Sequence, residues 1–224
     1  MKWPNKKTIV CIFAHPDDEA FGSGGTIAKL VKTNDVYLIC ATKGESGKER
    51  GKMGSKNLGK IREHELLASA KILGIKKVFS LGFKDGELCN NLYHSLAAKI
   101  EAILKKLRPE IIMTHEPRGG SGHIDHIVVS MVTSFVFERL PFIKTVLQHC
   151  LTEKRARKNK GYFIYVPYGY KDFEIDLKVD VRDTWDTKIR AMTRHQSQIH
   201  DVKRILKRSR GFPKVENFLV RSKK

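Results

Sequence analysis

Two short segments of the sequence hold side chains whose types and spacing could bind a metal ion. Residues 14–19 read Ala-His-Pro-Asp-Asp-Glu, and residues 115–126 read His-Glu-Pro-Arg-Gly-Gly-Ser-Gly-His-Ile-Asp-His. Zn²⁺ readily accepts imidazole nitrogens and carboxylate oxygens, and a catalytic zinc site keeps three protein ligands and one water. Such a site lowers the pKa of the bound water to roughly 7 and polarises a carbonyl oxygen. The two segments together therefore predict a metal-assisted hydrolase.

The adjacent carboxylates Asp17 and Asp18 are expected to divide the chemistry between them. One can ligate the metal ion, while its neighbour accepts a proton from the activated water as general base. A further acid that orients a ligating imidazole is also expected. Residues 15–17 could instead form a turn whose acids cap the first helix. Because both segments follow predicted strands, we favour the metal site.

The first half of the sequence alternates strand-like and helix-like patterns. Short apolar runs predict strands, and apolar residues at helical spacing predict the helices between them. Parallel strands joined by right-handed helical crossovers give an α/β fold with helices on both faces of the sheet. Ligand sites in such sheets lie beyond the carboxyl ends of the strands. The predicted strands are 8–13, 36–41, 77–81 and 110–114. The first predicted helix ends near residue 32, and the next two cover 61–73 and 92–107.

The rest of the sequence gives less regular patterns. Residues 42–57 are rich in glycine, lysine and serine and predict a long loop. No linker or repeat separates the elements, so we expect one domain over residues 1–224 that includes the basic C-terminal third, residues 154–224. Beyond residue 123 we expect helices at 124–139 and 183–206 and strands at 161–167, 173–181 and 215–220.

The two metal-binding segments occur in a combination that resembles a known protein family. Ala-His-Pro-Asp-Asp-Glu after the first strand, followed later by His-x-Asp-His at 123–126, is similar to the motifs of the LmbE/PIG-L family of zinc-dependent N-deacetylases. The resemblance covers essentially residues 8–220. Supporting matches lie at residues 41–47, 62–65, 81–86, 188–198 and 216–218.

The resemblance implies a Rossmann-like three-layer sandwich that hydrolyses the N-acetyl group of a glucosamine-type substrate. It implies that zinc is held by His15, Asp18 and His126. Asp17 matches the general base that activates the zinc-bound water. His123 matches the histidine that stabilises the tetrahedral oxyanion or protonates the amine leaving group. The chemistry expected from the residue types agrees, because a developing oxyanion is stabilised by a positive group placed beside it.

Two further residues receive roles from the resemblance. Asp125 matches the acid that holds a neighbouring histidine in place, and Arg62 matches a residue that contacts the sugar. Ile124 departs from the proline that many family members carry between the histidine and the aspartate. The departure leaves the reactive groups in place, so the predicted catalysis is unaffected.

The formal net charge of +19 over 224 residues leaves a second function open. Residues 154–224 carry 20 basic and 8 acidic side chains, and such a segment could bind a polyanion or nucleic acid. No nucleic-acid-binding motif accompanies this charge, so we expect no dedicated nucleic-acid partner. We expect instead a cationic pocket rim that favours acetylated amino-sugar conjugates bearing phosphate or carboxylate.

The sequence also gives expectations about the protein's surroundings. No apolar run approaches the roughly 18 residues that cross a bilayer, and the apolar stretch 8–14 is too short for a secretory signal. The four cysteines form no Cys-x-x-Cys pair, which fits reduced thiols. We therefore expect a cytoplasmic protein without a transmembrane segment, and a homo-oligomer stays open.

Overall fold

The computed structural model describes residues 4–49, 52–53, 57–159 and 165–223. In this part of the chain seven strands form one sheet in the order β5-β2-β1-β6-β7-β9-β8. The first five strands of this order run parallel, whereas β9 is antiparallel to both of its neighbours. The strands are β1 (Thr8–Phe13), β2 (Asp35–Thr42), β5 (Lys77–Phe83), β6 (Ile111–His115), β7 (Thr145–Cys150), β8 (Leu177–Asp180) and β9 (Val215–Ser222).

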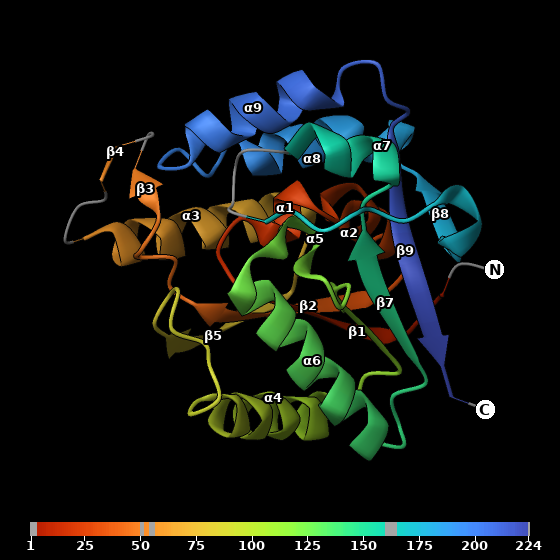
Figure 1. Cartoon of the computed structure of the whole chain (residues 1–224). Helices are drawn as coiled ribbons and strands as arrows, with labels where there is room; N and C mark the ends of the chain where they lie inside the picture. The colour runs from red at the N-terminus through yellow and green to blue at the C-terminus, as the bar shows by residue number, and fades with distance from the viewer. Residues whose placement is uncertain (1–3, 50–51, 54–56, 160–164, 224) are drawn as a thin grey trace.

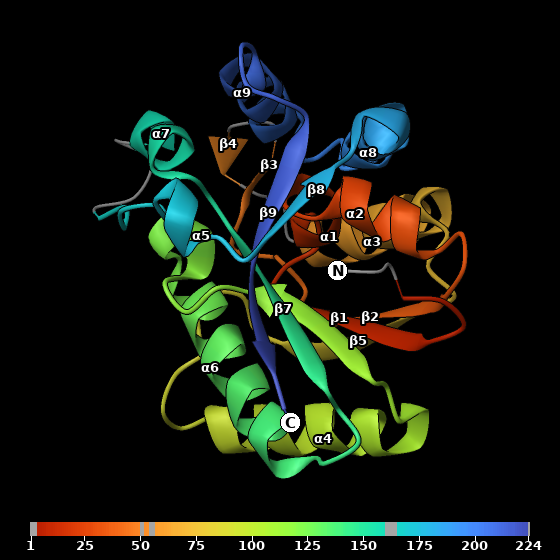
Figure 2. The same cartoon turned by 90° about the vertical axis from the view of Figure 1, so that its right-hand side faces the viewer.

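Helices cover both faces of the sheet, as Figures 1 and 2 show. One layer consists of α1 (Asp18–Phe21), α2 (Gly24–Leu30), α3 (Leu58–Leu73) and α8 (Trp185–Met192). The opposite layer consists of α4 (Tyr93–Leu107) and α6 (Ile124–Arg139). Three further helices are α5 (Gly119–Gly122), α7 (Glu153–Ala156) and α9 (Ile199–Ser209). The arrangement confirms the predicted α/β sandwich with a mostly parallel sheet.

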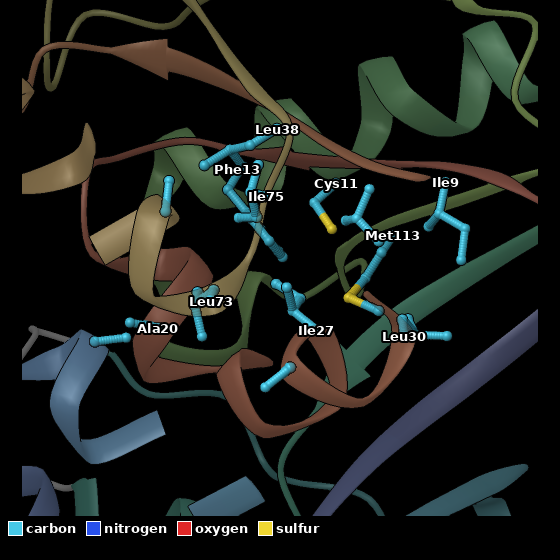
Figure 3. Close-up of a cluster of buried hydrophobic side chains, with 14 of the residues drawn as sticks. Ile9, Cys11, Phe13, Ala20, Ile27, Leu30, Leu38, Leu73, Ile75 and Met113 are labelled. Carbon is cyan, nitrogen blue, oxygen red and sulfur yellow. The ribbon is translucent and has the colours of Figure 1, made fainter. Parts of the chain in front are cut away.

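Strand β1 lies inside the sheet, and its side chains alternate between two hydrophobic cores. Ile9, Cys11 and Phe13 belong to the core under α2, α3 and α8, part of which Figure 3 shows. Val10 and Ile12 belong to the core under α4 and α6. All five side chains are at most 1 % exposed. A parallel strand that is covered on both faces has this continuous apolar character, which explains why the sequence predicted β1 clearly.

The four strands predicted in the first half of the chain are present as β1, β2, β5 and β6. The prediction missed β7, because Gln148 and His149 interrupt its apolar pattern. Gln148 is nevertheless 1 % exposed. The predicted loop at 42–57 contains a short hairpin, formed by β3 (Lys48–Glu49) and β4 (Lys52–Met53).

The C-terminal third differs more from the sequence prediction. Of the strand predicted at 161–167, residues 161–164 lie outside the described residues and 165–167 form no strand. The strand predicted at 173–181 is confined to β8. The helix predicted at 183–206 is broken between α8 and α9. It breaks because polar side chains turn inward there: His195 Nε2 lies 2.8 Å from Glu19 Oε1, and Ser197 Oγ donates to Glu65 Oε2 at 2.7 Å.

The basic third belongs to the same sheet as the rest of the described chain, since residues 217–222 of β9 pair with β7. Glu216 on β9 also fixes the start of α2. Its two carboxylate oxygens accept hydrogen bonds from the backbone N–H groups of Gly25 at 2.9 Å and Thr26 at 2.7 Å. Lys188 Nζ on α8 donates to the same carboxylate at 2.6 Å. No helix among the described residues has the length and apolar character needed to cross a bilayer.

We expect Glu216→Gln to lower the free energy of unfolding by about 3 kcal/mol at pH 7, because it leaves Lys188 buried without its counter-charge. Burial alone would raise the pKa of Glu216, but Lys188 and Thr26 outweigh burial and lower this pKa below 4.5. The ionised carboxylate therefore stabilises the fold above about pH 4.5, and this contribution is lost as the pH falls through the lowered folded-state pKa. Urea unfolding at pH 7 and at lower pH measures both effects.

The matched control is Glu63→Gln, which removes an exposed carboxylate from α3 and should change stability by no more than about 0.5 kcal/mol. Equal stability of Glu216→Gln and the wild type at pH 7 would show that the buried pair contributes nothing.

Candidate metal centre and active site

The two sequence segments meet because β1 and β6 are neighbouring parallel strands. They pair along Ile9–Cys11 and Ile111–Met113, so the segments that follow them leave the sheet at the same edge. The first segment continues into α1, and the second passes through α5 into α6. His15, Asp18 and His126 thereby line one cavity of about 850 Å³.

The ligand atoms of these three residues approach one another in pairs to 3.7 Å or less. His15 Nδ1 lies 3.1 Å from His126 Nε2, and Asp18 Oδ1 lies 3.3 Å from the same His126 atom. His15 Nδ1 and Asp18 Oδ2 are 3.7 Å apart. Tetrahedral zinc with bonds of about 2.0–2.1 Å separates two ligand atoms by about 3.4 Å. The three side chains therefore fit a zinc-sized ion.

Hydrogen bonds behind the two histidines determine which ring nitrogens face the centre. His126 Nδ1 donates to the carbonyl oxygen of Gly119 at 3.0 Å, which leaves the lone pair on Nε2. His15 Nε2 lies 3.0 Å from Asp85 Oδ1 and 3.1 Å from Asp125 Oδ2. That nitrogen therefore carries a proton, and Nδ1 faces the centre. Carbonyl and carboxylate partners of this kind orient metal-binding imidazoles.

Burial alone would lower the pKa of His15, but its hydrogen bonds to Asp125 and Asp85 outweigh burial and raise this pKa to about 10, so His15 must release a proton when it ligates a metal. The electrostatics of Asp18 and His126 instead favour the protonation states that bind a cation. Burial alone would raise the pKa of Asp18, but His126 and His115 outweigh burial and hold this pKa well below its usual range. Burial lowers the pKa of His126 well below its usual range. Asp18 opposes this shift, and the neighbouring imidazoles add to it. An ionised carboxylate and a neutral imidazole are the forms that ligate a metal.

Asp17 stands beside this cluster in an unusual backbone conformation. Its φ of 112° lies in a region that L-residues rarely adopt, at a cost of about 1–3 kcal/mol that the surroundings must offset. Its N–H donates to Glu19 Oε2 at 3.0 Å, and Arg62 Nη2 donates to its Oδ2 at 2.9 Å. Burial raises the pKa of Asp17 to about 7, although Arg62 opposes the shift. A carboxylate with a pKa near neutrality suits general-base catalysis.

Arg62 is buried beneath Asp17 and connects α3 to the segments around Pro16 and Gly44. Its guanidinium donates to the carbonyl oxygens of Pro16 at 2.5 Å and Gly44 at 2.7 Å, in addition to Asp17. A Cβ at position 44 would lie 2.5 Å from the Arg62 Cζ, and Gly44 has a φ of +68°. A side chain at position 44 would be strained and would collide with Arg62, which explains the glycine in the segment 41–47 that matches the family. The predicted contact of Arg62 with the sugar stays a prediction.

His123 forms the N-cap of α6 and lines the cavity. The backbone N–H of Asp125 donates to His123 Nδ1 at 3.1 Å, so a neutral His123 ring carries its proton on Nε2. Burial and the nearby His15 lower the pKa of His123. The ring is therefore a neutral hydrogen-bond donor close to the three candidate ligands.

Two residues of the site were not among those predicted from the sequence. His115 stacks on His126 with ring centroids 4.0 Å apart, and its Nε2 lies 3.2 Å from Asp18 Oδ2. Asp85 reaches His15 from the end of β5. Both stand at the carboxyl ends of parallel strands, which is the signal that could have selected them. Six of the seven predicted site residues line the cavity, and the seventh, Asp125, contacts His15.

The fold and this site define a Rossmann-like α/β protein with a histidine–carboxylate centre beyond its parallel strands, the arrangement expected of a metal-dependent hydrolase. The chain belongs to the PIG-L family, described as GlcNAc-PI de-N-acetylase, which its residues 10–136 match.

Known proteins with similar sequences include deacetylases. The 1D-myo-inositol 2-acetamido-2-deoxy-alpha-D-glucopyranoside deacetylase of Mycobacterium sp. (strain JLS) is 30% identical over 85% of this chain and 74% of its own. The diacetylchitobiose deacetylase of Thermococcus kodakarensis is 32% identical over 86% of this chain and 70% of its own. The solved N,N'-diacetylchitobiose deacetylase of Pyrococcus horikoshii has a TM-score of 0.73 at 24% identity and covers 96% of this chain and 84% of its own. This last likeness supports the fold.

Proposed function

We propose that this protein is a zinc-dependent amidohydrolase that removes the N-acetyl group from an N-acetylglucosamine-type conjugate. The observation that carries the proposal is the close approach of His15, Asp18 and His126 to one another, with Asp17 next to Asp18 in sequence, in a chain of the PIG-L family. Two imidazoles and one carboxylate are a ligand set that catalytic zinc sites use, which supports zinc. The basic side chains that line the same cavity, Arg155, Lys158, Arg204 and Arg208, support an anionic conjugate.

In this proposal the chain's own residues carry out the proton transfers of amide hydrolysis. A bound metal ion supplies Lewis acidity toward the acetamide carbonyl and the water. Asp17 takes a proton from the attacking water while the water oxygen bonds to the carbonyl carbon. The C–N bond then breaks as the amine nitrogen receives from Asp17 the proton that Asp17 took from the water. Acetate and the free amino sugar leave.

His123 is proposed to face the carbonyl oxygen on which negative charge develops. A donor that is already in place where charge develops stabilises the transition state without reorganisation. The N-terminus of α6, which His123 caps, adds partial positive charge at the same position. Asp125 and Asp85 contribute indirectly, because they hold His15 in orientation.

The comparisons do not favour the alternative of a polyanion- or nucleic-acid-binding protein, because the relatives named above are deacetylases. Part of the basic third lines the same cavity as the candidate metal centre. We therefore propose that residues 1–224 act as one deacetylase domain.

The free cysteines, of which Cys11, Cys40 and Cys150 are buried, support a reducing compartment such as the cytoplasm.

The proposed function is tested by a deacetylation screen with free-amine detection across N-acetylglucosamine conjugates. We expect the zinc-loaded protein to release amine from at least one of them. Removing zinc with a chelator should lower the rate at least about 100-fold, since several kcal/mol of transition-state stabilisation depend on the metal. Stoichiometric zinc should restore the rate, whereas Mg²⁺, which prefers octahedral oxygen ligands, should not. Unchanged activity in protein that metal analysis shows to be metal-free would overturn the proposal.

A further inference from the structure

A cluster of positive charge lines a part of the cavity that supplies none of the candidate metal ligands. Its walls come from α7, from the 3-10 turn that follows it (Arg157–Asn159), and from α9. In both cartoon views α7 and α9 lie at the same end of the molecule, beyond α5. The basic side chains that these elements contribute to the cavity lining are Arg155, Lys158, Arg204 and Arg208.

The two cations on the α7 side are fixed against one aromatic ring. The guanidinium carbon of Arg155 lies 5.3 Å from the centroid of the Phe212 ring, and Lys158 Nζ lies 4.5 Å from it. Cations within about 6 Å of a ring centroid are attracted to its face. Arg155 Nη2 also donates to the carbonyl oxygen of Pro213 at 2.6 Å. These contacts hold two positive charges at the cavity wall.

The two cations on the α9 side lie one helical turn apart. Arg204 and Arg208 are at i and i+4, so both are on the same face of the helix, and both are half-buried. The acidic side chain that α9 contributes to the lining is Asp201, which pairs with Arg204 and lies 3.0 Å from His200 Nε2. From α7, the turn after it and α9, four basic groups and one acidic group thus face the cavity, and Glu216 of β9 also lines it, near Arg155.

We propose that this wall is a binding site for an anionic group, a phosphate or a carboxylate, on the aglycone of the acetylated sugar. The guanidinium fork matches the oxygens of both anions, and the lysine adds a point charge. The cavity of about 850 Å³ lies in the upper part of the range of ligand pockets, so an aglycone fits beside the sugar. The proposal rests on the proposed function only for the acetamido end of the ligand.

The test measures binding rather than turnover. Zinc-loaded protein carrying Asp17→Asn, which should not consume the ligand, is titrated in a calorimeter with three probes. These are N-acetylglucosamine 1-phosphate, the carboxymethyl glycoside of N-acetylglucosamine and its neutral methyl glycoside. We expect at least one anionic probe to bind about tenfold more tightly than the neutral one at 50 mM salt, with a smaller ratio at 500 mM because salt screens the charges. The stronger of the two anionic probes identifies the preferred anion.

Two double variants locate the site. Lys158→Gln with Arg208→Gln removes one cation from each wall, and the ratio of anionic to neutral affinity should fall about tenfold, as expected for lost charged hydrogen bonds. Lys154→Gln with Lys207→Gln removes the same charge from α7 and α9 at exposed positions outside the cavity lining. This control should leave the ratio within about twofold. The affinity ratio compares two ligands on one protein, so a partial loss of folding cancels.

The outcomes separate this proposal from the proposed function. Equal affinities for anionic and neutral probes, or the same ratio in both double variants, would overturn the anion site. If the anion site is overturned but the protein with Asp17 intact releases amine, the deacetylase function is retained without the anion site. If the ratios follow the expectation but no conjugate is deacetylated, the anion site stands and the deacetylase function is wrong.

Discussion

Asp17→Asn is expected to lower the kcat of amine release by about 10²–10⁴-fold while the protein keeps stoichiometric zinc. Asparagine has the size of aspartate and, like it, is one of the residues that adopt positive φ most readily, so the backbone at φ 112° should persist. Its amide cannot accept a proton from water. Metal binding should survive because the Asp17 carboxylate is bonded to Arg62 at 2.9 Å, while His15, Asp18 and His126 remain. Steady-state kinetics and metal analysis of the same preparation measure both properties.

A suitable control is Asp186→Asn, which removes an exposed carboxylate near the start of α8 and should keep wild-type kinetics. If Asp17→Asn lost zinc together with activity, Asp17 would be a metal ligand and not the general base. A variant with wild-type kcat would remove Asp17 from the reaction.

His126→Ala is expected to abolish stoichiometric zinc binding and to lower kcat/KM at least about 10³-fold. The substitution removes the nitrogen that lies closest to both other candidate ligands, at 3.1 Å from His15 and 3.3 Å from Asp18. His115→Ala should have a smaller effect, because His115 only orients Asp18 and stacks on His126. Loss of such a supporting residue costs about 10–100-fold in metal affinity. Zinc titration followed by metal analysis ranks the two variants.

The matched control is His94→Ala, an exposed histidine on α4, which should bind zinc as the wild type does. Full zinc occupancy in His126→Ala would refute its assignment as a ligand. An equal loss of affinity in His115→Ala and His126→Ala would mean that His115 itself ligates the metal, through the group Asp18, His115 and His126, whose ligand atoms lie within 4.8 Å of one another.

The position of the site followed from the sequence because its determinants are local. Residues 9–13 form an unbroken apolar run, and the metal-binding segment begins directly after it. The same holds for β6 and the segment that ends at His126. Pairing of these two strands was enough to bring the predicted ligands together, and parallel α/β topology makes such pairing the expected result. Neither step required knowledge of distant contacts.

What the sequence could not give depends on contacts between distant residues. The break between α8 and α9 is fixed by the bond of His195 to Glu19, which are 176 positions apart. No local periodicity records such a bond. The burial of Arg62 under Asp17 likewise depends on the approach of α3 to the segments around Pro16 and Gly44. Strand β7 was not predicted because its sequence mixes polar and apolar residues. Such a strand can still lie inside the sheet, since Gln148 is buried there.

The bond between Glu216 and the start of α2 has a consequence for the protein during its synthesis. A ribosome makes every predicted site residue by position 126, about ninety residues before it makes Glu216. Domains fold as units while the chain emerges N-terminus first, yet β9 must insert between β7 and β8 before its carboxylate can reach Gly25 and Thr26. A nascent chain that stops before residue 215 thus contains every predicted site residue and still lacks the contact that fixes the helix beside them. We expect such truncated chains to be the ones that intracellular proteases degrade first.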